Sequence, residues 1–177
     1  MANLQTRMIR AAQLDVSLYE EVEADKGALG QAMSVVVLSS LAAGIGTIGT
    51  GGLNGVVFGT IAALIGWYVW AFITYVVGTR LLAQPQTKTD YGELLRTIGF
   101  SSSPGLIRVF GIIPGLAGIV FLVTGIWMLV AMVIAVRQAL DYTSTLRAVG
   151  VCLIGWILQA ILLGVLLAVL GGTAGSI

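Results

Sequence analysis

The sequence contains no histidine, a single cysteine and three prolines. Without histidine it lacks the side chain that proteins use most often as a general base and as a metal ligand. One thiol, Cys152, cannot form a disulfide within the chain. No aspartate or glutamate lies inside an apolar run, although proton- or sodium-coupled transporters usually bury such a group in the membrane. We therefore expect no catalytic site, no metal and no cofactor.

Charged side chains are scarce as well. Only 10% of the residues are charged and 58% are hydrophobic, whereas a soluble domain has about 25% charged residues. A soluble fold of 177 residues has too little interior to bury so much apolar surface. The net charge of +1 gives no reason to expect a nucleic-acid partner. The composition therefore predicts an integral membrane protein whose first partner is the lipid bilayer.

The apolar runs predict an all-α bundle of five transmembrane helices in one membrane domain, residues 28–177, preceded by a cytoplasmic arm, residues 1–27. A helix needs about 20 apolar residues to cross the bilayer. Five segments meet this requirement: 28–49, 53–79, 91–113, 114–136 and 147–171. The link between the first two, Thr50-Gly51-Gly52, is short and rich in glycine.

The third span, 91–113, is the ambiguous one, because it holds three serines before Pro104 and carries Arg108. It could instead lie in the membrane interface. The distribution of charge favours five spans. With five spans and the N-terminus inside, sixteen of the 17 charged residues lie on the cytoplasmic side, where basic residues are enriched. This places the C-terminus outside and the protein in the cell membrane. We expect Gly99 and Pro104 to kink the third helix.

The first thirty residues lack the features of a signal peptide and are expected to be retained. Leu4 and Met8 recur at helical spacing, which predicts short amphipathic helices that are solvated or lie at the interface. Alternatively, the arm docks a partner. Ser17 and Glu20 fit a capping box at a helix start, as do Asp90 and Glu93.

Two rows of small residues recur at a spacing of four: Gly51, Gly55 and Gly59 in the second span, and Ala160, Gly164 and Ala168 in the last. Such rows allow helix backbones to approach closely in lipid. They serve packing within the bundle or against a second protein. The glycines of residues 44–49 also match the dinucleotide-binding pattern, but no strand precedes them and no acidic residue follows within 40 positions.

The intramembrane polar candidates are Arg108 and Gln159. Arg108 lies near the outer end of its span, so it can snorkel to the headgroups. A lipid phosphate or a polar bond inside the bundle is the alternative. Gln159 is expected to hydrogen-bond between helices. Three tryptophans lie well inside their spans and are expected to fill gaps between helices: Trp67, Trp127 and Trp156.

The segment from Tyr91 to Pro104, YGELLRTIGFSSSP, resembles the signature of the Yip family of Ypt/Rab-interacting membrane proteins. The likeness covers most of residues 28–171 and rests on eight positions: Tyr91, Gly92, Leu95, Arg96, Gly99, Phe100, Pro104 and Pro114. The chain is similar to the short bacterial and archaeal members. The resemblance implies five spans, no catalytic residue and, by analogy with eukaryotic members, partners such as small GTPases.

We therefore expect a non-enzymatic membrane protein that binds or organises membrane partners, as an accessory subunit of a larger complex. Cytoplasmic proteins would dock on residues 1–27 and the Arg80–Arg96 loop, and membrane proteins on a glycine row. The alternative is a small oligomeric channel or permease. Its path would be lined by Ser101–Ser103, Arg108 and Gln159, which would then have to face the bundle interior.

Overall fold

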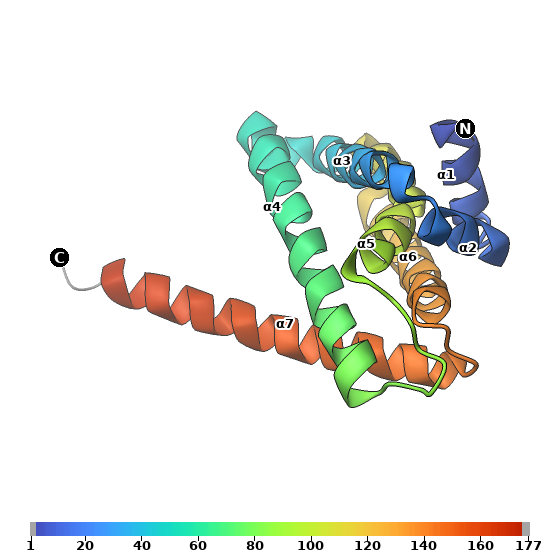
Figure 1. Cartoon of the computed structure of the whole chain (residues 1–177). Coiled ribbons are helices and arrows are strands. Elements are labelled where there is room, and N and C mark those ends of the chain that lie inside the picture. The colour runs from blue at the N-terminus through green and yellow to red at the C-terminus, as the bar shows by residue number, and fades with distance from the viewer. Residues whose placement is uncertain (1–2, 175–177) are drawn as a thin grey trace.

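The computed structural model describes residues 3–174, without the side chains of Thr50, Leu166, Leu167 and residues 169–174. All its regular elements are helical (Figure 1). In order they are α1 (Leu4–Ala12), α2 (Val16–Ala24), η1 (Lys26–Ala28), α3 (Leu29–Gly46), α4 (Ile48–Val76), the π-helical turn η2 (Val77–Leu81), α5 (Tyr91–Phe100), the 3₁₀ segment η3 (Ser103–Ile112), α6 (Ala117–Ala139) and α7 (Thr145–Ala174).

Four segments of the described chain are long and apolar enough to cross a bilayer: Lys26–Gly46, Gly51–Leu81, Ala117–Ala139 and Thr145–Val165. Large apolar side chains cover their outer faces: Leu53 is 75% exposed, Phe58 71% and Leu122 65%. In water this surface would be unfavourable, but acyl chains cover it at no cost. The prediction of an all-α membrane protein is confirmed, and Figure 1 shows α7 extending well beyond the rest of the bundle.

The expected third span, 91–113, is not one continuous helix. α5 ends at Phe100, a turn follows at Ser101 and Ser102, and η3 begins with Pro104 in its first turn. Proline fits there because its missing N–H has no partner in a first turn. The predicted interruption is therefore present, as a change of helix type. The fifth crossing is not confirmed, because neither piece alone reaches the length that a bilayer requires.

α3 and α4 are almost contiguous, and Figure 1 shows the chain turning sharply between them. α4 begins at Ile48, before the expected link Thr50-Gly51-Gly52, and Gly52 interrupts it with φ 59° and ψ −172°. Only glycine adopts this conformation without steric cost. The glycine-rich link is thus a break inside the first turns of α4.

η3 packs tightly against α3 because glycines replace side chains where their backbones meet. A Cβ atom at Gly46 would overlap the carbonyl oxygen of Arg108, and one at Gly105 would overlap the hydroxyl of Ser39. A Cβ at Gly99 in α5 would lie 2.8 Å from that of Ala32 in α3. Gly99 therefore permits close helix approach, and the interruption lies after it.

The N-terminal arm consists of two helices, as predicted, but it is docked on the bundle instead of free. Leu18, Tyr19 and Val22 of α2 are completely buried, where α2 packs on α5 and α6. The expected capping box at Ser17 is wrong. Asp15 is the N-cap of α2 and accepts a hydrogen bond from the Ser17 N–H, so the helix starts two residues earlier.

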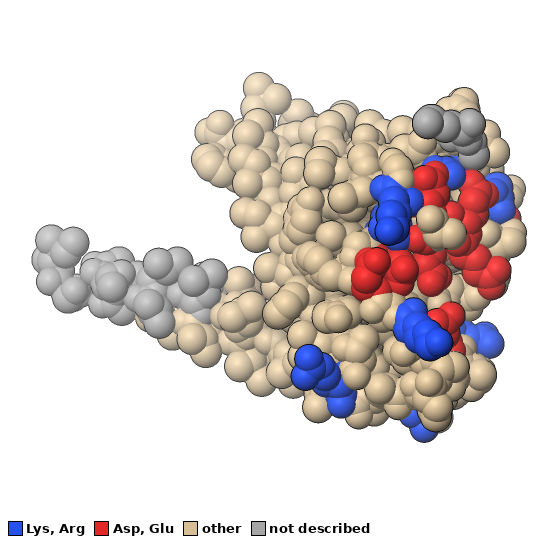
Figure 2. Space-filling model, in the orientation of Figure 1, with Lys and Arg blue, Asp and Glu red and all other residues tan. Residues whose placement is uncertain are grey.

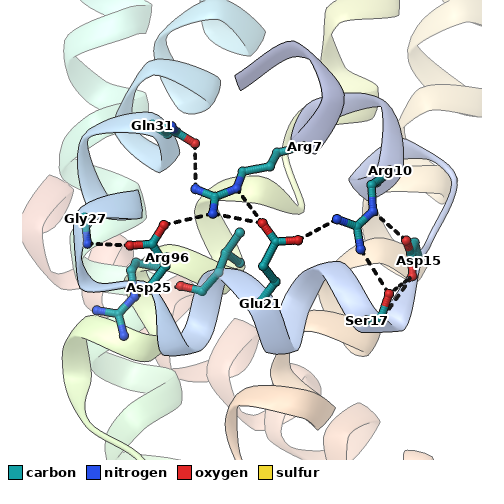
Figure 3. Close-up of polar contacts among 10 residues, drawn as sticks. Arg7, Arg10, Asp15, Ser17, Glu21, Asp25, Gly27, Gln31 and Arg96 are labelled. Atoms are coloured by element: carbon teal, nitrogen blue, oxygen red, sulfur yellow. Dashed lines mark hydrogen bonds and ion pairs between the residues drawn. The ribbon is translucent and has the colours of Figure 1, made fainter. Parts of the chain in front are cut away.

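Arg7 fixes the arm from the inside. Its guanidinium is only 4% exposed and bonds Glu21 at 2.9 Å, Asp25 at 2.8 Å and Gln31 at 2.9 Å, joining α1, α2 and α3 (Figure 3). Arg10 forms two ion pairs, one with the other carboxylate oxygen of Glu21 and one with Asp15. Arg10 and Arg7 lower the pKa of Glu21, and Arg7 lowers the pKa of Asp25.

Figure 2 shows a mixed acidic and basic group over α1, α2 and the adjoining parts of the chain, and further basic patches lower down, near the end of α4 and the start of α7, while the visible start of α4 carries no charge. This grouping agrees with the charge asymmetry of the sequence, in which only Arg108 lies away from the other charged segments.

Candidate binding cavity and the motif that positions it

The motif that begins at Asp90 is a structural brace at the centre of the bundle. Asp90 and Glu93 form a complete capping box: the Glu93 N–H donates to Asp90 at 2.9 Å, and the Asp90 N–H donates to Glu93 at 2.8 Å. The Tyr91 hydroxyl then donates to the carbonyl of Tyr68 in α4 at 2.8 Å. At Gly92, a Cβ would lie only 3.0 Å from Asp90. α5 is thereby fixed at its start.

Arg96 joins this brace to the arm. Its side chain is buried, its Nε donates to the carbonyl of Val22 at 2.9 Å, and Nη2 donates to the carbonyl of Glu23. Both carbonyls belong to the last turn of α2, where a cation satisfies free oxygens and the helix dipole together. Leu95 and Phe100, which precede and follow Arg96 in α5, are also buried. The carbonyl of Leu95 accepts a hydrogen bond from the indole N–H of Trp67 at 3.1 Å.

The segment after the brace brings Arg108 into the bundle. Pro104 and Gly105 are buried against neighbouring helices, and η3 then runs to the exposed turn at Pro114. The carbonyl of Arg108 lies against Gly46, which fixes the backbone at that point. The side chain is half-buried and its guanidinium lies 5.5 Å from the ring centre of Phe121.

A cavity of about 280 Å³ lies where α3, α4, η3, α6 and α7 meet. Its polar lining includes Ser39, Ser102, Arg108 and Gln159, and its apolar lining includes tryptophan and methionine side chains. The sequence singled out Arg108 and Gln159 separately, some 50 residues apart, and the fold brings them to the same cavity. Of the three serines, Ser102 lines it, while Ser101 and Ser103 donate to the carbonyls of Ile98 and Phe100.

Arg108 has no polar partner in the part of the chain that the structure describes. Its Nε is buried without a hydrogen bond, and the ion pairs among the described residues all belong to Arg7 and Arg10. A second cavity, also about 280 Å³, shares Arg108 and Ser40 and continues along Gly55 and Gly59 between α3 and α4. Arg108 therefore stands between two connected hollows of the bundle.

The Yip1 domain family matches residues 17–170, which include the brace, η3 and both cavities. The chain belongs to the Yip1-domain family. Comparison with curated proteins, and with solved structures, gives no match. The resemblance read from the Tyr91–Pro104 segment is confirmed. In this Yip1-domain protein, four of the motif positions have direct structural roles: Tyr91 and Arg96 bond neighbouring helices, Gly99 permits close approach, and Pro104 starts η3.

The glycine rows of the Yip1-domain protein face outward or into open space, and Gly55 and Gly59 also line the second cavity. A Cβ atom at Gly51, Gly55, Gly59 or Gly164 would meet nothing within 4 Å. The same outward position holds for Ala160 and Ala168 in α7, which are exposed. The glycines that pack inside the bundle are others: Gly46, Gly78, Gly99, Gly105 and Gly111. Gly99, Gly105 and Gly111 recur every six residues and all lie against α3, a spacing that differs from the four-residue rows expected for helix packing in lipid.

Two of the expected gap-filling tryptophans are well placed to join elements. Trp67 is 5% exposed, and the indole N–H of Trp127 donates to the carbonyl of Ala12 at 2.8 Å, holding the end of α1. Trp156 differs, because it is 45% exposed and lines the cavity beside Trp70, with 6.5 Å between ring centres.

A third hollow, about 540 Å³, lies at the charged end of the bundle and was not foreseen from the sequence. Glu20 and Glu23 of α2 meet Glu93 of α5 and Asp141 of the α6–α7 turn there. Burial and the repulsion of the other three carboxylates raise the pKa of Glu23 to about 7. Among the described residues, no group with the geometry of a metal site is present. These acids lie far apart in sequence, so only the fold reveals their proximity.

Proposed function

We propose that this Yip1-domain protein is a non-enzymatic membrane protein that binds other membrane proteins within the bilayer, as an accessory subunit of a larger complex. The exposed glycine row of α4 carries this proposal. Gly55 and Gly59 leave space along one side of α4 after the break at Gly52, Gly51 leaves space just before that break, and the exposed Leu53 and Phe58 belong to the same helix. A partner helix can approach such a surface closely and gain dispersion contacts that acyl chains provide less well.

The test uses leucine to fill the row without touching the cavities. Gly51→Leu does this in α4 and Gly164→Leu in α7, because neither glycine lines a cavity that contains Arg108. Gly118→Leu, at another open position on α6, is the matched control. Proteins crosslinked in intact membranes should co-purify with the wild type and the control but be lost from one row variant. Retention of every partner by both row variants would refute docking on these rows.

For topology we propose five crossings, with the N-terminus inside, the C-terminus outside and α5 with η3 forming the third crossing in the cell membrane. The concentration of charge on one side supports this arrangement. Reporters inserted at Gly52 and fused to the C-terminus should both report the outside. A cytoplasmic C-terminal reporter would mean that α5 and η3 do not cross.

Cytoplasmic proteins, in this proposal, dock on residues 1–27 and on the exposed part of the Arg80–Arg96 segment, which is the loop before α5, because Leu95 and Arg96 are buried in that helix. Because α1 and α2 are part of the packed core, deleting them would damage the fold as well as the surface. Ile9 and Val16 are 50% and 45% exposed and can be changed separately. Ile9→Asp and Val16→Asp should release a cytoplasmic partner and leave thermal stability unchanged. If every crosslinked cytoplasmic protein remains bound, the charges there serve topology alone.

A small oligomeric channel or permease is the second candidate, favoured by the shared cavity of Ser102, Arg108 and Gln159. Purified protein in liposomes should then release an anion in preference to a cation, because the charged group of the cavity is an arginine. Release no faster than from empty liposomes would reject this candidate.

A further inference from the structure

Four side chains with donor groups at the Arg108 cavity have no acceptor among the described residues, whereas a fifth, Ser40, donates to the carbonyl of Val37. Apart from Arg108 itself, the side chains of Ser39, Ser102 and Gln159 line the cavity, and none of the four makes a hydrogen bond to the described residues. The Nε of Arg108 is both buried and unpartnered, so bulk water does not satisfy it. Polar groups inside a protein nearly always have partners. A set of four side chains that share one hollow and lack partners is the composition of a binding site.

The charge of the site defines its ligand. No carboxylate is among the described residues that line either cavity at Arg108, and arginine remains charged in proteins. An unpaired charge in an apolar bundle costs several kcal/mol, and an anion with hydrogen-bonding oxygens offsets this cost. The planar guanidinium fits two oxygens of a phosphate group at once.

The apolar surroundings define the rest of the ligand. The second cavity continues from Arg108 past Gly55 and Gly59, where the absence of side chains leaves a groove between α3 and α4. In the other direction the lining is Trp70, Trp156 and methionine, without charge. A free ion would leave these apolar surfaces uncovered, whereas an amphiphile covers them.

We propose that the Arg108 cavity binds an anionic phospholipid, with the phosphate on Arg108 and an acyl chain in the groove lined by Gly55 and Gly59. Ser102 and Gln159 donate hydrogen bonds to the remaining oxygens. The bilayer supplies such lipids to a hollow at membrane depth, and the groove lies between α3 and α4, two of the segments long and apolar enough to cross the bilayer. This inference does not depend on partner docking at Gly51 or Gly164.

Native mass spectrometry of the full chain in detergent tests it. The probes are dioleoylphosphatidylglycerol, dioleoylglycerol with the same chains but no phosphate, and inorganic phosphate. The variant Arg108→Gln removes the charge, and Lys88→Gln removes one from an exposed loop as the matched control. We expect Arg108→Gln to lose about tenfold or more in retained phosphatidylglycerol, as for a charged hydrogen bond, while Lys88→Gln behaves as the wild type. Arg108→Lys should retain an intermediate amount.

Gly59→Leu is the second variant, because it fills the groove with an apolar side chain at an open position and leaves Arg108 intact. It should also lose phosphatidylglycerol, which keeps the test decisive if Arg108→Gln does not fold. Equal retention of phosphatidylglycerol by the foldable variants and the wild type would overturn the proposal. The proposal would also be overturned if the wild type retained dioleoylglycerol as well as it retains phosphatidylglycerol. The same holds if inorganic phosphate stabilised the protein as much as the lipid does.

Discussion

Replacing Arg96 with alanine should detach the end of α2 from α5 and destabilise the whole fold. In the native structure one buried guanidinium donates to the carbonyls of Val22 and Glu23. Alanine leaves both oxygens without that donor, and Val22 is completely buried, so water does not replace it there. The negative end of the α2 dipole also loses its cation.

The size of the effect follows from these losses. A buried acceptor left without its partner costs about 1–3 kcal/mol, and the half-exposed second carbonyl costs less because water can reach it. Loss of the cation at the helix end adds about 0.3–1 kcal/mol. We therefore expect Arg96→Ala to lower the free energy of unfolding by about 2–4 kcal/mol. Arg96→Lys keeps the charge but reaches one carbonyl instead of two, so it should lose about half as much.

Unfolding in mixed micelles, followed by tryptophan fluorescence, measures this difference. Arg147→Ala is the control, because Arg147 is exposed and contacts only the carbonyl of Leu82 at 3.5 Å. It should change stability by less than about 0.5 kcal/mol. Trypsin gives a second readout, since a detached arm exposes the chain at Arg7 and Arg10. If Arg96→Ala is as stable as the control and its arm resists trypsin, the bracing role of the motif is refuted.

Further predictions concern the α3–η3 contact and the acidic hollow. Gly46→Ala should lower the free energy of unfolding by about 1–3 kcal/mol, because the new Cβ overlaps the carbonyl of Arg108. Gly164→Ala, at an open helical position, should raise it by up to about 1 kcal/mol. Equal effects of the two substitutions in the same micelle assay would contradict the close contact. The pKa of Glu23 is raised from 4.5 to about 7, so the folded state holds a proton that the unfolded state has released. The contribution of Glu23 to stability should therefore be greatest below pH 4.5, fall as the pH rises from 4.5 through about 7, and then level off. Glu23→Gln should remove this fall in stability. Glu20→Gln should only move the fall to lower pH, because this substitution takes away one of the carboxylates that repel Glu23. An unchanged pH profile in Glu23→Gln would show that another group titrates.

Composition alone determined that the chain is a helical membrane protein. Acyl chains impose continuous apolar runs, so the runs at α3, α4, α6 and α7 could be located to within a few residues. The capping box at Asp90 was equally predictable, because a cap depends on residues adjacent in sequence. The family was recognisable from the Tyr91–Pro104 segment for the same reason: its residues are contiguous.

The tertiary structure decided everything that depends on contacts between distant segments. Nothing in the sequence around Arg96 indicates that its partners are carbonyls of α2, some 74 residues earlier. Small-residue spacing pointed to Gly51 and Gly55, but a Cβ atom there would meet nothing within 4 Å, while the buried glycines do not follow the four-residue spacing. The cavity itself exists only because η3 places Arg108 between five helices. Local patterns report local geometry and solvent, whereas a binding site depends on how the helices cross.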